Sequence, residues 1–419
     1  MYLNISNNTF LYTQNENIPE LLLTIKDAGG NAVTDITSLT YKTVTDGKGT
    51  SITGYDITNK SGVITLFDNR EITASPTKTD EWNITVTLVN YDKDQSNNMG
   101  KSFNAKLMIQ KEKIKETVTD VCSNGQTLSS CIIAMDGKDD TLYHHTSSLT
   151  NGAGDNSYRY AGASDKVNNF VCFGTNAATC PTDNLYRIIG VIDDKVKLIK
   201  YDYANSNLLG TNGDYDGSST PDSSTYKGSL TSIDTYSWNN VTNKNTWSES
   251  NLNKINLNTN FINNIGSTWA NKIATTTWKV GGNTFDNIGS SVPSIAYQNE
   301  IVAPAENTTY DAKIGLMYVS DYGFAASPSA WTTTLYNYDG NDAKGTSIKT
   351  INWMYMGYYD WMISRDSDYS GIAFIVYDDG RVNYYYVSSN YGVRPSFNLL
   401  SSITYVSGSG SAVDPILIN

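Results

Sequence analysis

The sequence predicts a mainly β chain, in which a small N-terminal β-sandwich precedes a larger α+β part. Three observations support this fold class. Short alternating apolar runs, separated by turn residues, fill about the first 110 residues. A hairpin pattern and one helical pattern follow among short aromatic segments. Hydrophobic residues make up 39% and charged residues only 17%, so the polarity comes mainly from Asn, Ser, Thr, Gly and Tyr, a composition typical of β-rich, exported proteins.

The first domain is predicted over residues 1–112. Turn signals such as Asp46-Gly47 separate its strand-like runs, which are Leu21–Ile25, Val63–Phe67, Trp82–Val89 and Phe103–Ile109. This pattern resembles the immunoglobulin-like modules that bacterial surface proteins use as spacers. The resemblance implies a stalk that holds another domain away from the cell wall and carries no chemistry of its own.

A connecting segment is predicted over residues 113–154, and it contains the first of two cysteine pairs. The pairs are Cys122/Cys131 and Cys172/Cys180, with eight and seven residues between their members. Neither has the Cys-x-x-Cys spacing of a zinc site. Two local disulfides are the simplest interpretation and imply an oxidising location; four unpaired buried thiols are the alternative.

The third region, residues 155–419, is predicted to be the ligand-binding domain. Leu185–Ile192 and Val196–Tyr201 flank a short polar turn and predict a hairpin. A polar loop is expected from Ser206 to about Thr246. Beyond it, apolar residues recur at helical spacing, with Ser248 or Ser250 as N-cap and Gly266 as the stop; they are Trp247, Leu252, Ile255, Phe261, Ile262 and Ile265.

Charge and hydropathy exclude two classes of partner. The net charge is −12, opposite in sign to a surface that tracks phosphates, so no nucleic-acid binding is expected. No run of about 18 apolar residues exists, so no membrane insertion of this segment is expected. Met1-Tyr2-Leu3-Asn4 leads straight into polar sequence. We therefore expect an extracellular or cell-surface protein whose export signal or anchor is missing from this chain.

Residues for catalysis are scarce, and we predict no enzyme activity, no catalytic residue, no metal site and no cofactor. The two histidines, His144 and His145, are adjacent and lie in no nucleophile-elbow or His-Glu-x-x-His pattern; we expect them on the surface or in a turn.

Two Asp-rich loops, at 136–140 and 214–217, lack the EF-hand order. They are expected to be solvated turns, with structural calcium left open, and a glycosidase carboxylate pair is a minor alternative.

Tyrosine is concentrated near the C-terminus. Nine tyrosines fall in the 37 residues from Tyr355 to Tyr391, against 30 in the whole chain. The intervening residues are mostly Ser, Asp, Asn and Gly, the mixture found in antibody binding loops. A buried aromatic cluster is the alternative, but it does not fit Tyr384-Tyr385-Tyr386, because consecutive strand residues point to alternate sides of a sheet. At least one of these three tyrosines must leave the core.

Several motifs in this region resemble those of C-type-lectin-fold proteins from the formylglycine-generating-enzyme branch, which include variable proteins of diversity-generating retroelements. The closing strand Gly392-Val393-Arg394-Pro395 carries the resemblance together with earlier segments, namely Asp183–Gly190, Trp247–Leu252, Asn352–Gly357 and Trp361–Arg365. In that family, errors at adenines vary codons near the 3′ end of the gene. Codons of the type AAY then never yield Lys, Glu, Gln, Met or Trp. These five residues are absent from 364–391, and also from 392–419.

The resemblance implies a C-terminal lectin-like domain whose variable side chains contact a ligand, while Trp353, Trp361, Arg394 and Phe397 form the scaffold. Calcium-sugar motifs and the catalytic cysteines of the branch are absent, so neither activity is implied. The predicted ligand-binding residues are Tyr358, Tyr359, Asp366, Asp368, Tyr369, Phe374, Tyr377, Asp378, Asp379, Arg381, Asn383, Tyr384, Tyr385, Tyr386, Ser388 and Ser389.

The expected function is contact recognition by a surface-exposed binding protein. The partner is a protein or glycan on another cell or host surface, and four acids against one base in the predicted set favour a neutral to basic patch on it. A fixed glycan-binding adhesin and a phage tail receptor-binding protein are the alternatives. The sequence leaves the oligomeric state open.

Overall fold

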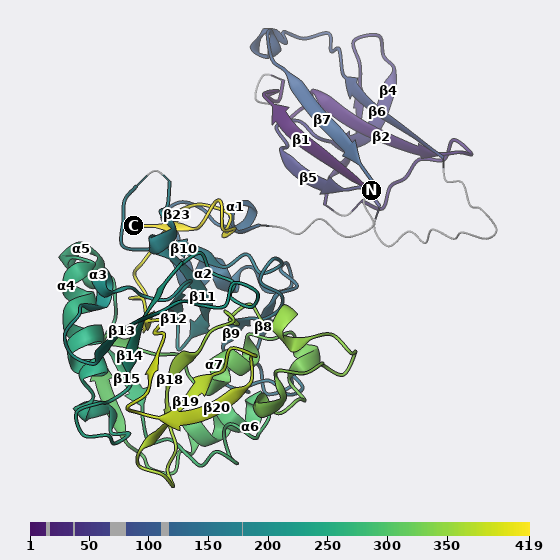
Figure 1. Cartoon of the computed structure of the whole chain (residues 1–419). Coiled ribbons are helices and arrows are strands. Elements are labelled where there is room, and N and C mark those ends of the chain that lie inside the picture. Colours follow the sequence, from purple (N-terminus) through teal and green to yellow (C-terminus); the bar gives the residue numbers. More distant parts are fainter. Residues whose placement is uncertain (14–16, 37, 68–80, 110–116, 178) are drawn as a thin grey trace. The chain divides into compact units, whose positions relative to one another are not determined.

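Separate hydrophobic cores divide the chain into two units, Met1–Ile114 and Lys115–Asn419. The computed structural model describes residues 1–13, 17–36, 38–67, 81–109, 117–177 and 179–419. Strands predominate over helices in both units (Figure 1), which confirms the expected β-rich fold class.

The first unit consists of two antiparallel sheets with strand orders β5-β1-β7 and β3-β4-β2-β6. All four predicted strand regions are present, and β1, β3 and β4 are additional strands. Leu21, Leu23 and Ile25 of β2 lie in the core between the sheets. The strands are β1 (Tyr2–Asn8), β2 (Leu21–Asp27), β3 (Tyr41–Thr45), β4 (Ser51–Asp56), β5 (Gly62–Thr65), β6 (Trp82–Leu88) and β7 (Phe103–Met108), with a short helix η1 (Ser96–Asn98).

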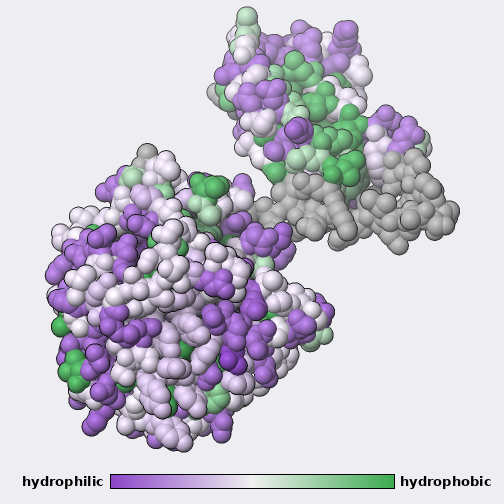
Figure 2. Space-filling view, in the orientation of Figure 1, coloured by the Kyte–Doolittle hydropathy of each residue, from purple (hydrophilic) through white to green (hydrophobic). Residues whose placement is uncertain are grey.

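Two edge strands of this unit leave apolar side chains in solvent. In β6, Val86 and Leu88 pair with the buried Leu23 and Leu21 and so share their side of the sheet, yet both are exposed. Leu107 on β7 is exposed as well. Figure 2 shows hydrophobic surface gathered on this unit.

The second unit is built around a sheet of order β17-β22-β12-β11-β9-β8, with β10 also paired to β11. The predicted hairpin forms its centre, and Asp193 and Asp194 at its turn have φ angles of 49° and 59°. Positive φ at both central residues is typical of a tight two-residue hairpin turn. The strands are β8 (Leu142–His144), β9 (Tyr158–Tyr160), β10 (Phe170–Cys172), β11 (Leu185–Ile192), β12 (Lys195–Lys200), β17 (Ile314–Gly315) and β22 (Ser396–Asn398).

Four smaller sheets surround this one, with orders β13-β14-β21, β15-β16, β18-β19-β20 and β23-β24. The region from 206 to 246, expected as a loop, contains α3 (Ser206–Leu209) and two strands. The strands of these sheets are β13 (Tyr215–Ser219), β14 (Ile233–Ser237), β15 (Thr276–Lys279), β16 (Thr309–Ala312), β18 (Asp360–Arg365), β19 (Ile372–Val376), β20 (Val382–Tyr386), β21 (Asn390–Tyr391), β23 (Tyr405–Ser407) and β24 (Leu417–Ile418).

The predicted helix is present after residue 246, with a wide π-helical turn over most of its length. Ser250 Oγ accepts a hydrogen bond from the Asn253 N–H (3.1 Å) at the start, and Gly266 ends the helix with a φ of 78°. Besides α3, the described helices after residue 180 are η2 (Thr182–Asn184), η3 (Trp247–Glu249), η4 (Leu252–Phe261), α4 (Ile262–Asn264), α5 (Ser267–Ala270), α6 (Pro293–Tyr297), η5 (Gln298–Val302), α7 (Val319–Phe324), η6 (Pro328–Ala330), η7 (Leu335–Asn337) and η8 (Ile348–Thr350).

The segment predicted to connect the domains instead belongs to the second unit from residue 117 onward. It forms α1 (Val118–Val121) and α2 (Leu128–Ile133), whose apolar residues join the main core. Its backbone also pairs with the C-terminal part of the chain, because the Leu128 N–H donates to the Ile403 carbonyl (2.8 Å) and the Tyr405 N–H to the Gln126 carbonyl (2.8 Å). The expected start of the second domain at residue 155 is therefore too late.

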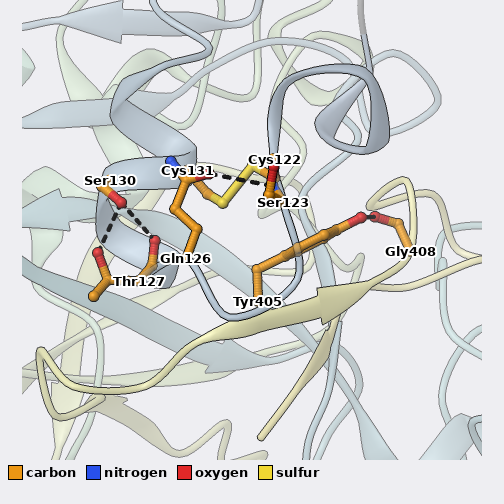
Figure 3. Close-up of a disulfide and its surroundings, with 8 residues drawn as sticks. All are labelled: Cys122, Ser123, Gln126, Thr127, Ser130, Cys131, Tyr405 and Gly408. Carbon is orange, nitrogen blue, oxygen red and sulfur yellow. Dashed lines mark hydrogen bonds between the residues drawn. A yellow bond between two sulfur atoms is a disulfide. The ribbon is translucent and has the colours of Figure 1, made fainter.

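Both predicted disulfides are present, and they rule out the alternative of four free thiols. Cys122 at the end of α1 is bonded to Cys131 on α2 (Figure 3), with 5.3 Å between their Cα atoms. Cys172 at the end of β10 is bonded to Cys180, with a Cα separation of 5.8 Å. Disulfides persist in oxidising compartments, so this pair fits an extracellular protein. No helix in the described ranges has the length and apolar character needed to cross a lipid bilayer.

Candidate functional site

The tyrosine-rich segment forms the three-stranded sheet β18-β19-β20, in which β20 is an edge strand. The central strand β19 is covered on both sides, so Ala373, Phe374 and Ile375 are all buried. The edge strand carries Tyr384, Tyr385 and Tyr386, which are 37%, 40% and 65% exposed. The prediction that at least one of these tyrosines leaves the core is confirmed, since all three reach solvent.

The three tyrosines point to both sides of the edge strand. Tyr384 makes an edge-to-face contact with Phe285, with 5.0 Å between ring centroids. Tyr385 contacts Tyr391 at 5.5 Å and Tyr386 at 6.0 Å. Because neighbouring residues of a strand alternate in direction, the exposed rings form a ridge around the strand and not one flat surface.

Ring contacts continue from the edge strand onto other segments. Tyr391 stacks on Tyr359 at 5.0 Å, and Tyr359 contacts Tyr377 at 5.2 Å. The Arg381 guanidinium lies 4.9 Å from the Tyr377 ring centroid and 5.5 Å from that of Tyr336. We call this set the aromatic ridge; its members are Phe285, Tyr336, Tyr359, Tyr377, Arg381, Tyr384, Tyr385, Tyr386 and Tyr391.

Three members of the ridge were missed in the predicted site. Tyr391 directly precedes the closing strand motif Gly392–Pro395, while Phe285 and Tyr336 lie far away in the sequence. Tyr336 contacts Phe285 at 5.7 Å, which joins them to Tyr384. Local composition around residues 285 and 336 carries no tyrosine-rich signal, so only the folded chain reveals their place.

Phe374 lies beneath the surface, contrary to the exposed position predicted for it. Its side chain is fully buried and stacks on Phe285 with 6.3 Å between centroids. It lies opposite Tyr384 in the register of β19 and β20, so it packs beneath the ridge residues Phe285 and Tyr384. The prediction placed it among exposed residues because β19 was not recognised as a central strand with two covered sides.

Asp366 is likewise buried, contrary to the prediction, and acts on the local backbone. Its carboxylate accepts hydrogen bonds from the N–H groups of Asp368 (2.8 Å), Tyr369 (3.0 Å) and Phe285 (3.1 Å). Asn245 secures the same loop by donating to the carbonyl oxygens of Asp366 (2.7 Å) and Ile372 (2.8 Å). Asp366 therefore orders the loop that presents its exposed neighbours.

The other predicted residues lie at the surface or partly beneath it, but they do not form one compact site. Asp368, Tyr369 and Ser388 border the Tyr386 end of β20, whereas Asp378, Asp379 and Arg381 lie at the opposite hairpin turn. The five-residue strand between these ends spans about 13 Å. Exposed members are Asp368, Tyr369, Tyr384, Tyr385, Tyr386 and Ser388; half-buried members are Tyr358, Tyr359, Tyr377, Asp378, Asp379, Arg381, Asn383 and Ser389.

The charge of this surface is smaller than the sequence indicated. Burial removes Asp366 from the exposed set, and Asp379 pairs with Arg381 at 3.3 Å. Burial also raises the pKa values of Tyr359, Tyr377 and Tyr391; neighbouring tyrosines add to the shift in all three, and aspartates add to it for Tyr359 and Tyr377. These phenols therefore stay neutral and keep their hydrogen-bond donors at physiological pH.

The predicted scaffold residues are all buried. Indole N–H groups tie the sheet to the rest of the unit, since Trp361 donates to the Tyr236 carbonyl (2.8 Å) and Trp353 to the Tyr160 carbonyl (2.8 Å). Arg394 binds the buried Asp360 carboxylate through Nε (2.5 Å). Phe397 lies in the main core.

The histidines differ from the surface positions predicted for them. His145 is fully buried, packs against Phe324 and Trp331, and accepts a hydrogen bond from the Ala153 N–H at Nδ1 (3.0 Å). Burial lowers its pKa to about 3, and the Arg159 cation adds to the effect. His144 is half-buried and stacks on Tyr158.

Carboxylates of both Asp-rich loops accept hydrogen bonds from backbone N–H groups. Asp214 accepts from the N–H groups of Leu252 (2.9 Å) and Asn240 (3.2 Å), and Asp139 accepts from the Thr141 N–H (2.8 Å). Within the described ranges, no three His, Cys, Asp or Glu side chains are grouped so that they could hold a metal ion.

Comparisons with known proteins add no relative. No family model matches the chain, and neither the curated proteins nor the solved structures searched contain a match.

Proposed function

We propose that this chain is a surface-exposed binding protein whose aromatic ridge recognises a protein or glycan partner. The observation that carries the proposal is the exposure of three consecutive tyrosines on the edge strand β20, joined by ring contacts to Tyr391 and Tyr359. Tyrosine offers a large contact area with a polar tip at low entropic cost, which is why it dominates many protein interfaces.

The ridge rests on a rigid base, which favours recognition by a preformed surface. Phe374 lies under Phe285 and Tyr384, and Asp366 fixes the neighbouring loop through three backbone hydrogen bonds. Side chains that are already ordered lose little entropy when a partner binds.

We further propose a C-type-lectin-like second unit, diversified by a retroelement and carried by an immunoglobulin-like first unit. Supporting this, Trp361 and Arg394 in the segments that resemble the fixed parts of that family are buried, while Tyr369 and Tyr384–Tyr386 between them are exposed. The two disulfides fit the surface location that the proposal requires.

The first experiment is deep sequencing of the 3′ end of this gene in its source population, across codons 353 to 398. Diversification predicts substitutions at the exposed positions 368, 369, 384, 385, 386 and 388. It predicts constancy at Trp361, Asp366, Phe374 and Gly392–Pro395, because these side chains or backbones are packed. Uniform reads would reject diversification and favour a fixed adhesin.

Binding by the ridge is tested with the full chain on a glycan array and on a surface-displayed peptide library. The affinity for any ligand found should fall at least about tenfold when Tyr384, Tyr385 and Tyr386 are all changed to Ser. The reason is that an aromatic residue at a binding hot spot often contributes about 2 kcal/mol. Val302→Ser with Val413→Ser is the control, because both are exposed apolar residues outside the ridge. Equal loss in the control, or none in the triple variant, would place the binding surface elsewhere.

A further inference from the structure

A cavity of about 370 Å³ lies in the second unit, away from the aromatic ridge. It is lined by residues of β9, β12 and β15 and by those around the start of α7, and none of its lining residues belongs to β18, β19 or β20. Its volume lies within the range of about 300–1,000 Å³ that is usual for small-molecule sites.

Two buried cations line this cavity and share one carboxylate. Lys197 Nζ lies 2.5 Å from Asp321 Oδ2, and Arg159 Nη1 lies 3.2 Å from Asp321 Oδ1. A second carboxylate, Asp155, takes the other end of the guanidinium at 2.8 Å. Lys197, Arg159 and Asp321 are each at most 4% exposed. Buried charges are costly unless paired and hydrogen-bonded, so this group is a built feature of the unit.

The Lys197 ammonium has hydrogen-bonding capacity left over among the described residues. An ammonium has three N–H donors, and within the part of the chain that the structure describes its side-chain hydrogen bond goes to Asp321. The ammonium also lies over the rings of Tyr318 at 4.6 Å and Trp278 at 5.5 Å. Burial lowers the pKa of Lys197 and Asp321 only partly offsets this, so a second anion in the cavity would favour the charged form.

The remaining lining residues favour an anionic ligand with a polar body. The charged lining groups are four cations, Arg159, Lys195, Lys197 and Lys279, and three acids, Asp155, Asp193 and Asp321, which leaves an excess of one positive charge in a chain of net charge −12. The Tyr318 hydroxyl accepts from the Lys279 N–H (2.7 Å) and keeps its own O–H as a donor. Threonines 275 and 276 add hydroxyl groups to the wall.

We propose that this cavity binds a small monocarboxylate with a hydroxylated ring, of the size and chemistry of an acidic monosaccharide. The carboxylate accepts from Lys197, beside the buried rings of Trp278 and Tyr318, and the ring of the ligand lies along the more exposed Thr275 and Thr276. The Tyr318 and threonine hydroxyls bind the hydroxyl groups of the ring. This proposal is independent of binding at the aromatic ridge.

The test is isothermal titration of the full chain with glucuronate, galacturonate and N-acetylneuraminate, using glucose and galactose as the neutral counterparts of the two uronates. At least one acid should bind, and a uronate should bind at least about tenfold more tightly than its neutral counterpart, as expected for a charge-assisted hydrogen bond. If none of the three acids binds up to about 10 mM, a range far weaker than typical small-molecule sites, the proposal is wrong.

Two variants locate the binding. Lys197→Met keeps the apolar stem but removes the charge, so affinity should fall at least about tenfold. Because Lys197 is buried, its folding is checked by circular dichroism. The double variant Lys195→Gln/Lys279→Gln, at partly exposed positions, should weaken binding even if Lys197→Met fails to fold. Tyr386→Ser is the matched control and should leave binding unchanged; unaltered binding in the double variant would overturn the proposal.

Discussion

At the scale of single residues, His145 makes the stability of the second unit depend on pH. Its pKa is lowered from 6.5 to about 3 by burial. The unfolded chain therefore takes up a proton near pH 6.5, which the folded chain does not bind until about pH 3. The contribution of His145 to stability is fully present above pH 6.5. As the pH falls below 6.5, the free energy of unfolding decreases with a slope that approaches about 1.4 kcal/mol per pH unit.

His145→Gln removes this titration. In urea unfolding at pH 7, 5 and 4, the free energy of unfolding of the wild type should fall more steeply than that of the variant, whose remaining slope reports the carboxylates. Some loss at pH 7 is expected because Gln cannot reproduce the packing of the imidazole against Phe324 and Trp331. Parallel pH dependences in the two proteins would contradict the assignment.

Gly392 is required by a close approach of side chain and backbone. A Cβ atom at this position would lie 2.3 Å from Cδ1 of Tyr203 and 3.1 Å from the Tyr359 carbonyl oxygen. We expect Gly392→Ala to lower the free energy of unfolding by about 1–3 kcal/mol, as overpacking of a dense core does. Gly371→Ala is the control, because its nearest neighbour would be 3.4 Å away. Equal unfolding midpoints in urea for the two variants would refute the argument.

The residues of the candidate site were predictable where local geometry decides, and not elsewhere. Three consecutive tyrosines cannot all face one core, so the exposure of Tyr384–Tyr386 followed from the sequence. Phe374 and Asp366 were misplaced because their burial depends on partners far along the chain, above all Phe285. Nothing within ten residues of either position signals that contact.

At the scale of elements, those set by local sequence were again predictable, and those set by distant pairing were not. The hairpin of β11 and β12 and the helix after Trp247 were predicted because each is set by local spacing, turn residues and caps. The strands between residues 206 and 246 were missed because β14 pairs with β21, more than 150 residues away. Their short, polar sequences resemble loops until that pairing is made.

The disulfide between Cys122 and Cys131 joins the two short helices α1 and α2. It closes a loop with a sequence separation of 9, so removing it should cost about 2–3 kcal/mol by the loss of its constraint on the unfolded chain. We expect Cys122→Ala/Cys131→Ala to lower the urea midpoint of the second unit. The wild type treated with dithiothreitol should shift at least as far, because both bridges are reduced. Unchanged midpoints in both cases would show that the bridge contributes no stability.

At the scale of the whole molecule, domain boundaries depend on contacts that composition does not report. The first unit ends at Ile114 by its internal contacts, and the sequence placed its end at residue 112. The start of the second unit was placed too late because Val118, Leu128 and Ile132 are widely spaced in a polar segment. These three residues belong to the main core, and backbone hydrogen bonds join their segment to Ile403 and Tyr405.

The separate cores predict that the two units unfold independently. The cluster around Leu23 and Ile25 draws on residues of the first unit, and the main cluster around Leu198 and Phe397 draws on the second. Each unit has its own sheets and the second has both disulfides. Calorimetry of the full chain should therefore show two transitions. A fragment spanning 115–419 should reproduce one of them at the same temperature and should respond to dithiothreitol as that transition does. A single cooperative transition, or a fragment that melts well below its counterpart in the full chain, would mean that the units stabilise each other and would contradict a first unit that serves only as a spacer.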